Sequence, residues 1–150
     1  MSASTLTQTA QRVVDAYNAW SIDQIMAFRS EDCIQEILPT SMNVPPQNNT
    51  QHEAHQRMIA PFFTNFHLVV LEQTVDESAK KVTLWAKATA DTVVGPYANE
   101  YVIALHMNEA GDRVVLVREF VDSGFAGPFF GKLRGHMMAA AGGKGGPAEH

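Results

Sequence analysis

The spacing of apolar residues predicts that helices come first along this chain. Over residues 4–19, apolar positions recur every three or four residues, as they do on one face of a helix. The positions on this face are Leu6, Ala10, Val13, Val14 and Tyr17. Ser21 and Gln24 have the spacing of a capping box, which predicts a short second helix ending near Arg29. Thr50 and Glu53 repeat that spacing, so a third helix is expected over 51–63.

Residues that favour strands dominate the rest of the predicted domain. A short strand is expected over 33–38, before Pro39, and a loop over 40–49. Longer strands are expected over 66–75, 81–92, 97–107 and 113–123. Because only short turns separate these longer strands, successive ones should pair in antiparallel fashion. Helices followed by a meander of strands predict an α+β fold, with one curved sheet over helices on a single face.

The chain beyond Ser123 is less regular. Its apolar residues are interrupted by Gly127, Pro128 and later glycines, which fits either a short final helix or an apolar arm over a cavity mouth. Glycines dominate the last residues, and such a tail does not recover the entropy lost on ordering. We therefore expect one domain over 1–141 and a disordered Gly-rich tail over 142–150.

Composition narrows the classes of function. The chain has 150 residues, 45% of them hydrophobic, which suffices for the core of a single domain. Its net charge of −5 disfavours nucleic-acid binding. No apolar run reaches the roughly 20 residues that a membrane helix needs. The first residues lack the basic and apolar regions of a secretory signal, so a cytoplasmic location is expected.

The sequence carries no motif for a metal or a cofactor. Cys33 is the single cysteine, which excludes an intramolecular disulfide and fits a structural thiol better than a nucleophile. The glycine patterns of nucleotide and dinucleotide sites are absent from the sequence. His52 and His55 lie one turn apart without a third ligand at suitable spacing, which favours a solvated helix face over a metal site. We expect chemistry by side chains alone, with neither metal nor cofactor.

The best candidate for chemistry is Glu119 in the last predicted strand. Alternate residues of a strand share a face, and here that face carries Val115, Val117, Glu119, Val121 and Ser123. A carboxylate on an apolar wall has a raised pKa and can exchange protons near neutral pH. The alternative is that the opposite face, with Val114, Leu116 and Phe120, is core and that Glu119 lies in solvent.

A second carboxylate, Asp91, belongs to the strand predicted over 81–92. Ala86, Ala88 and Ala90 line one face of this strand, and small side chains suit close packing of another sheet. If the alanine face is a subunit interface, then Trp85, Thr89 and Asp91 face the hollow of the fold. The alternative for Asp91 is that it caps the turn before Gly95.

Further candidates are polar groups that could bind substrate. Tyr97, Asn99 and Tyr101 alternate along one strand face above Ile103, which suits a polar aromatic substrate, although ordinary strand packing also explains tyrosines. Glu36 shares a strand face with Ile34 and Leu38, so a further carboxylate could reach the same hollow. Tyr17 on the core face of the first helix could place its hydroxyl there, or simply pack.

These elements and short motifs resemble a known family over roughly residues 5–135. Ala16-Tyr17-Asn18 and Arg118-Glu119-Phe120-Val121-Asp122 resemble the SnoaL-like group of the nuclear transport factor 2-like superfamily. Asp32-Cys33-Ile34, Leu38-Pro39, Asn99-Glu100-Tyr101 and the segment ending at Ser123 are similar to small fungal isomerases and cyclases of polyketides and meroterpenoids. The resemblance implies a cone-shaped α+β fold with a curved antiparallel sheet around N-terminal helices, and a homodimer formed through the sheet.

The resemblance also implies a reaction class. The last-strand carboxylate of SnoaL-like cyclases and limonene epoxide hydrolases corresponds by position to Glu119, and the acid of the preceding inward strand corresponds to Asp91. Thr89 stands where the epoxide hydrolases have an arginine, which disfavours epoxide opening. We expect isomerisation, cyclisation or dehydration of a polyketide or meroterpenoid ketone by proton transfer, without a cofactor. The alternative is a non-catalytic ligand-binding or dimerisation module that assists a partner enzyme.

Overall fold

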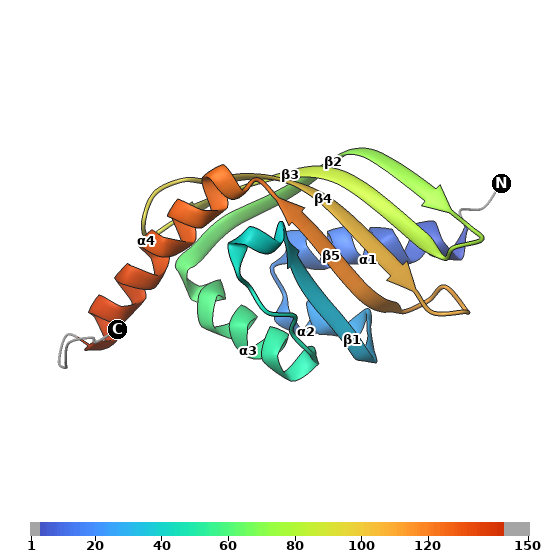
Figure 1. The fold of residues 1–150 in the computed structure, drawn as a ribbon, viewed down its shortest axis with the longest axis horizontal. Helices are drawn as coiled ribbons and strands as arrows, with labels where there is room; N and C mark the ends of the chain where they lie inside the picture. The colour runs from blue at the N-terminus through green and yellow to red at the C-terminus, as the bar shows by residue number, and fades with distance from the viewer. Residues whose placement is uncertain (1–3, 143–150) are drawn as a thin grey trace.

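The computed structural model describes residues 4–142, which form helices and one sheet. The helices are α1 (Thr5–Ala19), α2 (Ile22–Ala27), α3 (Asn49–Ile59) and α4 (Ser123–Gly142). The strands are β1 (Arg29–Leu38), β2 (Phe63–Asp76), β3 (Lys81–Thr92), β4 (Tyr97–Met107) and β5 (Val114–Val121). Figure 1 shows the long strands arching over α1, with α2 and α3 on the same concave side. The predicted α+β class, with a curved sheet and N-terminal helices, is confirmed.

The sheet has the strand order β1-β5-β4-β3-β2 and is open rather than closed into a barrel. Neighbours along the meander from β2 to β5 pair in antiparallel fashion, as their short turns predict. The exception is β1, which pairs with β5 in parallel. The chain between these two strands crosses over through α3 and the other strands, so turn length sets no rule for their pairing. An antiparallel sheet is therefore the wrong description of this one edge.

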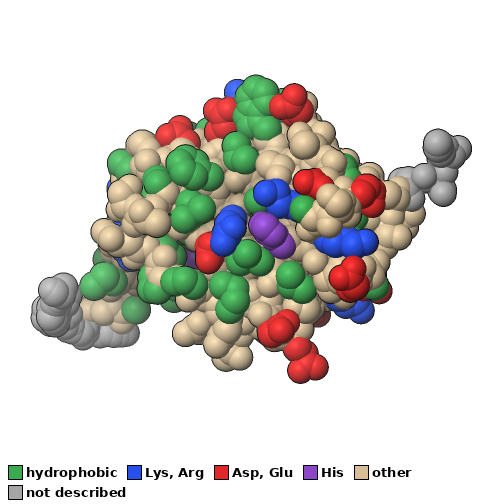
Figure 2. Space-filling view, turned by 45° about the vertical axis from the view of Figure 1, so that its right-hand side comes forward, with side chains coloured by type: hydrophobic (Ala, Val, Ile, Leu, Met, Phe, Trp, Pro, Cys, Tyr) green, Lys and Arg blue, Asp and Glu red, His purple; other side chains and the backbone are tan. Residues whose placement is uncertain are grey.

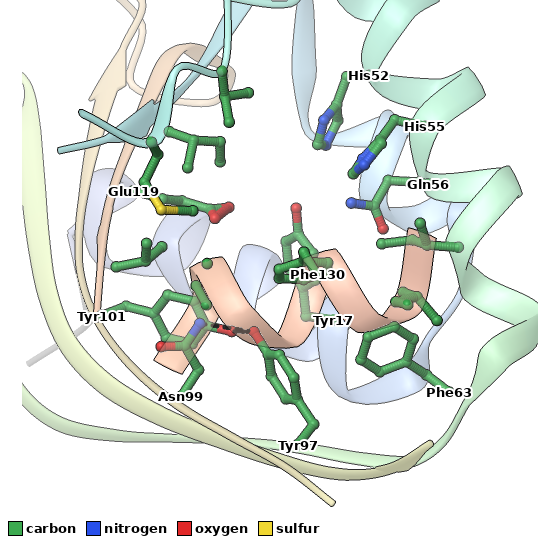
Figure 3. Close-up of a pocket in the computed structure, with 18 of the residues that line it drawn as sticks. Tyr17, His52, His55, Gln56, Phe63, Tyr97, Asn99, Tyr101, Glu119 and Phe130 are labelled. Carbon is green, nitrogen blue, oxygen red and sulfur yellow. Dashed lines mark hydrogen bonds between the residues drawn. The ribbon is translucent and has the colours of Figure 1, made fainter. Parts of the chain in front are cut away.

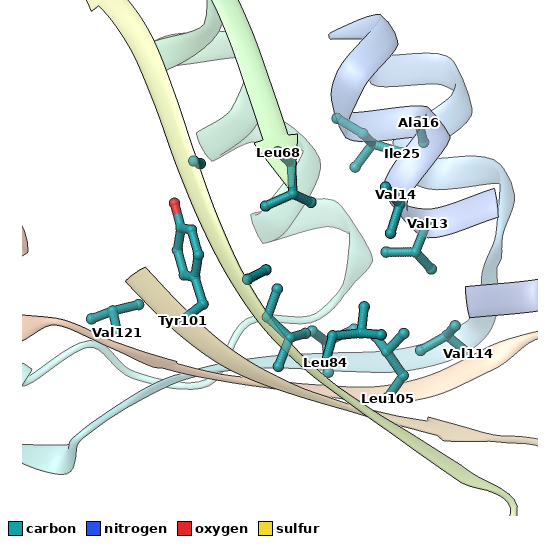
Figure 4. Packing of buried hydrophobic residues seen from close by; sticks show 14 of the residues in the cluster. Val13, Val14, Ala16, Ile25, Leu68, Leu84, Tyr101, Leu105, Val114 and Val121 are labelled. Atoms are coloured by element: carbon teal, nitrogen blue, oxygen red, sulfur yellow. The ribbon is translucent and has the colours of Figure 1, made fainter. Parts of the chain in front are cut away.

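The core lies between the predicted face of α1 and the concave face of the sheet. Leu6, Ala10 and Val13 of α1 are each at most 3% exposed. Figure 4 shows Val13 and Val14 directed toward Leu84 and Leu105 of the sheet. This core occupies one end of the curved sheet and leaves the other end available for a cavity.

A β-bulge decides which residues of β5 face inward. His106 pairs with Leu116 and Met107 pairs with Val114, so Val115 has no partner on β4. The extra residue reverses the alternation of faces. Val114 and Val117 are both buried for this reason, and the inward face continues from Val117 through positions 119 and 121.

Two helix boundaries differ from the sequence-based prediction. α3 begins at Asn49 because Asn48 and Gln51 form the capping box, each side chain accepting a hydrogen bond from the other residue's backbone N–H. α4 is a continuous helix that includes Pro128. The sequence fitted either a short helix or an apolar arm in this segment. The buried residues of α4, Ala126, Phe129 and Leu133, lie on one face, so packing outweighs the low helix propensity of its glycines. Residues 143–150 of the expected tail lie outside the described residues.

The surface offers two further observations. None of the helices within residues 4–142 is both long enough and apolar enough to cross a membrane. On the face drawn in Figure 2, basic and acidic side chains are mixed with apolar ones. That face therefore has no continuous basic patch of the kind that nucleic-acid binding needs.

Candidate functional site

A cavity of about 570 Å³ opens between the concave face of the sheet, α1, α3 and α4. Much of its wall is apolar and comes from all of these elements, including Ile37, Phe63, Phe66, Ile103 and Phe130. Figure 3 shows the polar side chains that project into it. The polar residues labelled there are Tyr17, His52, His55, Gln56, Tyr97, Asn99, Tyr101 and Glu119. A mostly apolar cavity with a few polar groups is the usual form of a small-molecule site.

Among the residues that line this cavity, Glu119 is the one with a carboxyl group. Gln35 Nε2 donates a hydrogen bond to Glu119 Oε1 at 2.8 Å, and Gln35 Oε1 accepts one from Arg29 at 2.6 Å. Burial raises the pKa of Glu119 to about 7, while the positive charge of Arg29 and the hydrogen bond from Gln35 partly offset this rise. At neutral pH both protonation states of Glu119 are therefore well populated, which suits a group that takes up and returns protons.

Tyrosine hydroxyls and an amide line the sheet side of the cavity. The hydroxyls of Tyr97 and Tyr101 are hydrogen-bonded to each other, and Asn99 Nδ2 donates to Tyr97 Oη at 3.0 Å. Burial raises the pKa of Tyr97 to about 12 and raises that of Tyr101 as well. Tyr17 projects from α1 with its hydroxyl toward the middle of the cavity, and burial raises its pKa too. These phenols stay protonated at neutral pH and can donate hydrogen bonds to a substrate oxygen.

Aromatic rings from three elements close one side of the cavity. Tyr97 of β4 contacts Phe63, Phe125 and Phe129 edge to face, with ring centroids 5.1–5.6 Å apart. Phe130 of α4 also contacts Tyr97 and lines the cavity. The first half of α4 is therefore part of the cavity wall of its own chain.

The structure corrects the predicted environment of the α3 histidines. We expected a solvated helix face, but His52 is 3% exposed and both His52 and His55 line the cavity. Burial lowers the pKa of His52 to about 3 and also lowers that of His55, so both imidazoles are neutral at neutral pH. Among residues 4–142, no three side chains of His, Cys, Asp or Glu converge as metal ligands would.

The predicted orientation of β3 is wrong. Ala86, Ala88 and Ala90 face the interior and are buried, because small side chains let the strand lie close to the elements beneath it. Trp85, Thr89 and Asp91 consequently project from the outer face and are exposed. Trp85 Nε1 donates to Glu100 at 2.7 Å, and Asp91 accepts a hydrogen bond from Asn65 at 2.8 Å. None of these three residues lines the cavity.

The predicted orientation of Glu36 is also wrong. Arg118 Nε donates to Glu36 Oε1 at 2.8 Å outside the cavity, and the two residues are register partners on β1 and β5. Gln35, the next residue along β1, is 1% exposed and occupies the inner position instead. The pairing of β1 with β5 is irregular between Arg29 and Ile34, so alternation along β1 alone does not reveal that Arg29 and Gln35 act beside Glu119.

Replacing Gln35 with Met should raise the pKa of Glu119 further. The hydrogen bond from Gln35 stabilises the charged carboxylate, so its loss favours the protonated form. The measurement is a pH titration of the Glu119 side-chain carbon by NMR in wild type and variant. As a control, Gln73→Met makes the same change at an exposed position on β2 and should leave the titration unchanged. A midpoint in Gln35→Met equal to or below the wild-type midpoint would contradict this arrangement.

Comparison with protein-family models finds no match. Relatives from fungi nevertheless match most of the chain. Monooxygenase AacuP of Aspergillus aculeatus is 32% identical over 135 residues, which cover 90% of this chain and 93% of AacuP. Austinoid biosynthesis cluster protein J of Aspergillus calidoustus is 37% identical over 122 residues, covering 79% of this chain and 73% of that protein.

Solved structures also match most of the chain. BvnE pinacolase from Penicillium brevicompactum has a TM-score of 0.81 and 29% identity, covering 91% of this chain and 96% of BvnE. A protein from Shewanella denitrificans described as a SnoaL-like polyketide cyclase has a TM-score of 0.71 at 8% identity, covering 87% of this chain and 99% of that one. At 8% identity the second similarity concerns the fold alone.

Proposed function

Since this chain belongs to the SnoaL-like proteins of fungal polyketide and meroterpenoid biosynthesis, we propose that it is an isomerase or cyclase acting by proton transfer next to a carbonyl. The main support for this proposal comes from Glu119. Its pKa is raised to about 7, and it lies on the wall of a largely apolar cavity. A dehydratase would use the same groups. Amino-acid side chains would carry out the proton transfer, without a metal or cofactor.

In the proposed mechanism, the Glu119 carboxylate removes a proton from the carbon next to a substrate carbonyl. Negative charge then develops on the carbonyl oxygen, and donors from Tyr17, Tyr101 or Asn99 would stabilise it, since all three line the same cavity. In an isomerisation, protonated Glu119 returns the proton at another carbon. In a cyclisation, the enolate carbon attacks a second carbonyl of the substrate, and Glu119 gives the proton to the alkoxide oxygen that forms there. A residue with a pKa near the working pH is suited to both steps.

The outer face of the sheet supports a further proposal, that the protein is a homodimer paired through this face. Trp85, Val102 and Phe120 are exposed there by 42%, 45% and 52%, respectively. Large apolar side chains gathered on one surface are typical of a protein interface.

The experiment for the proposed reaction is incubation with a panel of polyketide and meroterpenoid ketones in heavy water. Mass spectrometry follows deuterium uptake, and chromatography follows new isomers. We expect uptake next to the carbonyl that depends on Glu119. If a panel member binds but neither exchanges nor isomerises, the protein is instead a non-catalytic module that assists a partner enzyme.

The name of AacuP favours a second candidate reaction, oxygenation. The carbanion left by proton removal at an activated CH₂ group can react with O₂, giving a carbonyl group and one molecule of water. The first step would use Glu119 in the same way. Repeating the incubation under ¹⁸O₂ separates the two candidates, because only oxygenation places the label in the product.

A further inference from the structure

One wall of the cavity has polar groups that the proposed proton transfer does not use. His52, His55 and Gln56 all come from α3 and line the cavity. Figure 3 shows them across the hollow from Glu119, with the hydroxyl of Tyr17 between the two sides. His52 and Gln56 are separated by one helical turn and are only 3% and 9% exposed.

Two buried atoms on this wall have no hydrogen-bond partner. Within residues 4–142, four buried side-chain nitrogen or oxygen atoms are unpaired, and His52 Nε2 and Gln56 Oε1 are two of them. A buried polar atom without a partner destabilises the folded state. Apolar side chains of similar size would be more stable here, so these groups suit the binding of a polar ligand better than they suit the core.

The geometry around His52 defines which ligand group it can bind. Its Nδ1 lies 3.3 Å from Gln47 Oε1, an acceptor, so Nδ1 carries the proton and Nε2 is left as an acceptor. Gln47 is held in place by two backbone hydrogen bonds of 2.9 Å to Gln35. The low pKa of His52, about 3, keeps its imidazole neutral. A neutral acceptor nitrogen attracts a hydroxyl hydrogen and does not attract a carboxylate.

We propose that His52 and Gln56, with His55 beside them, form a subsite that binds a hydroxyl group of the substrate. This inference rests on the proposed function only in placing the reacting carbonyl near Glu119. The substrate class is then a ketone with an alcohol or phenol at the end remote from the reacting carbon. Binding of that hydroxyl fixes which carbon faces Glu119, so His52 and Gln56 determine specificity.

The test uses two probes that differ in one hydrogen-bond donor. 2-Naphthol can donate its hydroxyl hydrogen, whereas 2-methoxynaphthalene keeps the oxygen and lacks the donor. Titration of the full chain, followed by NMR signals of the histidine rings, should show 2-naphthol binding about tenfold more tightly, as expected for one well-placed hydrogen bond. His52→Phe and Gln56→Met should each reduce this preference to about twofold or less.

Stability separates a binding role from a structural one. Because Gln56 Oε1 is unpaired, Gln56→Met should leave the melting temperature unchanged or raise it, while it weakens the preference for 2-naphthol. The control Gln73→Met, at an exposed position on β2, should keep the preference. The binding readout needs no turnover, so it stands even if Glu119 proves inert.

Three outcomes would overturn the subsite. The first is equal binding of the two probes, or no binding of 2-naphthol, in the wild type. The second is a preference that survives both His52→Phe and Gln56→Met. The third is a Gln56→Met protein that melts several degrees below the wild type, which would mean that the amide supports the fold.

Discussion

Glu119→Gln should lose at least about a hundredfold of turnover while the protein stays folded, since a positioned general base contributes roughly 10²–10⁴-fold. The amide has almost the shape of the carboxylic acid but cannot take up a proton from carbon. The variant should therefore still bind substrate with similar affinity. The measurement is the rate of deuterium uptake in heavy water, compared with the dissociation constant of the same ketone.

The same substitution should change the pH dependence of stability. Burial raises the pKa of Glu119 from an ordinary 4.5 to about 7, so between these values the folded protein binds a proton that the unfolded chain releases. Stability contributed by this group is therefore lost as the pH rises toward 7 and above. Relative to wild type, Glu119→Gln should gain about 3 kcal/mol at about pH 8 and little at about pH 4. Urea unfolding at both pH values measures this difference.

Asp91→Asn provides the matched control for both measurements. It makes the same acid-to-amide change on the outer face of β3, where the carboxylate is exposed and lies outside the cavity. We expect wild-type turnover and an unchanged pH dependence. Full activity of a folded Glu119→Gln protein would remove Glu119 from the mechanism, and a loss in Asp91→Asn instead would return the chemistry to the outer face.

Phe129→Ala should destabilise the protein by about 3–5 kcal/mol, the usual cost of removing a buried phenyl ring. Phe129 is 5% exposed, and its ring contacts Phe63, Tyr97 and Phe125. The substitution leaves a void between α4 and the sheet that these aromatic rings cannot fill. Urea unfolding followed by far-UV circular dichroism measures the loss.

Met138→Ala is the control for Phe129→Ala. It tests whether truncating a side chain on α4 is costly only where that side chain is buried. Met138 lies further along α4 and is 50% exposed, so its truncation should change stability by less than about 0.5 kcal/mol. Equal and small effects of the two substitutions would mean that α4 is a detachable arm, the alternative that the sequence left open.

Strand alternation predicted only part of the site, and the reasons are physical. Tyr97, Asn99 and Tyr101 alternate on a regular strand, so one inward residue fixes the orientation of the others. Glu119 lies beyond the bulge at Val115, where alternation is again regular. The prediction for β3 is wrong because a row of alanines suits close packing against the interior as well as against another subunit, and composition alone does not choose between them.

The missing part of the site depends on tertiary structure. Gln35 reaches Glu119 only because β1 pairs in parallel with β5, a contact that no local pattern encodes. His52 lies on the face of α3 that lines the cavity. The helical pattern of α3 does not show whether that face meets a cavity or bulk solvent. Gln35 and His52 can be identified as site residues only from the positions of the neighbouring elements.

The hydrogen bond between Gln35 and Glu119 joins residues that are 84 positions apart. Closing so long a loop costs more chain entropy than forming the hairpins between β2 and β5, which favours a late place for this contact in the folding sequence. A collapsed chain in which β1 has not yet docked would leave the Glu119 carboxyl hydrated and as acidic as in a free peptide. The proton affinity of a single side chain would then report whether the last long-range contact has formed.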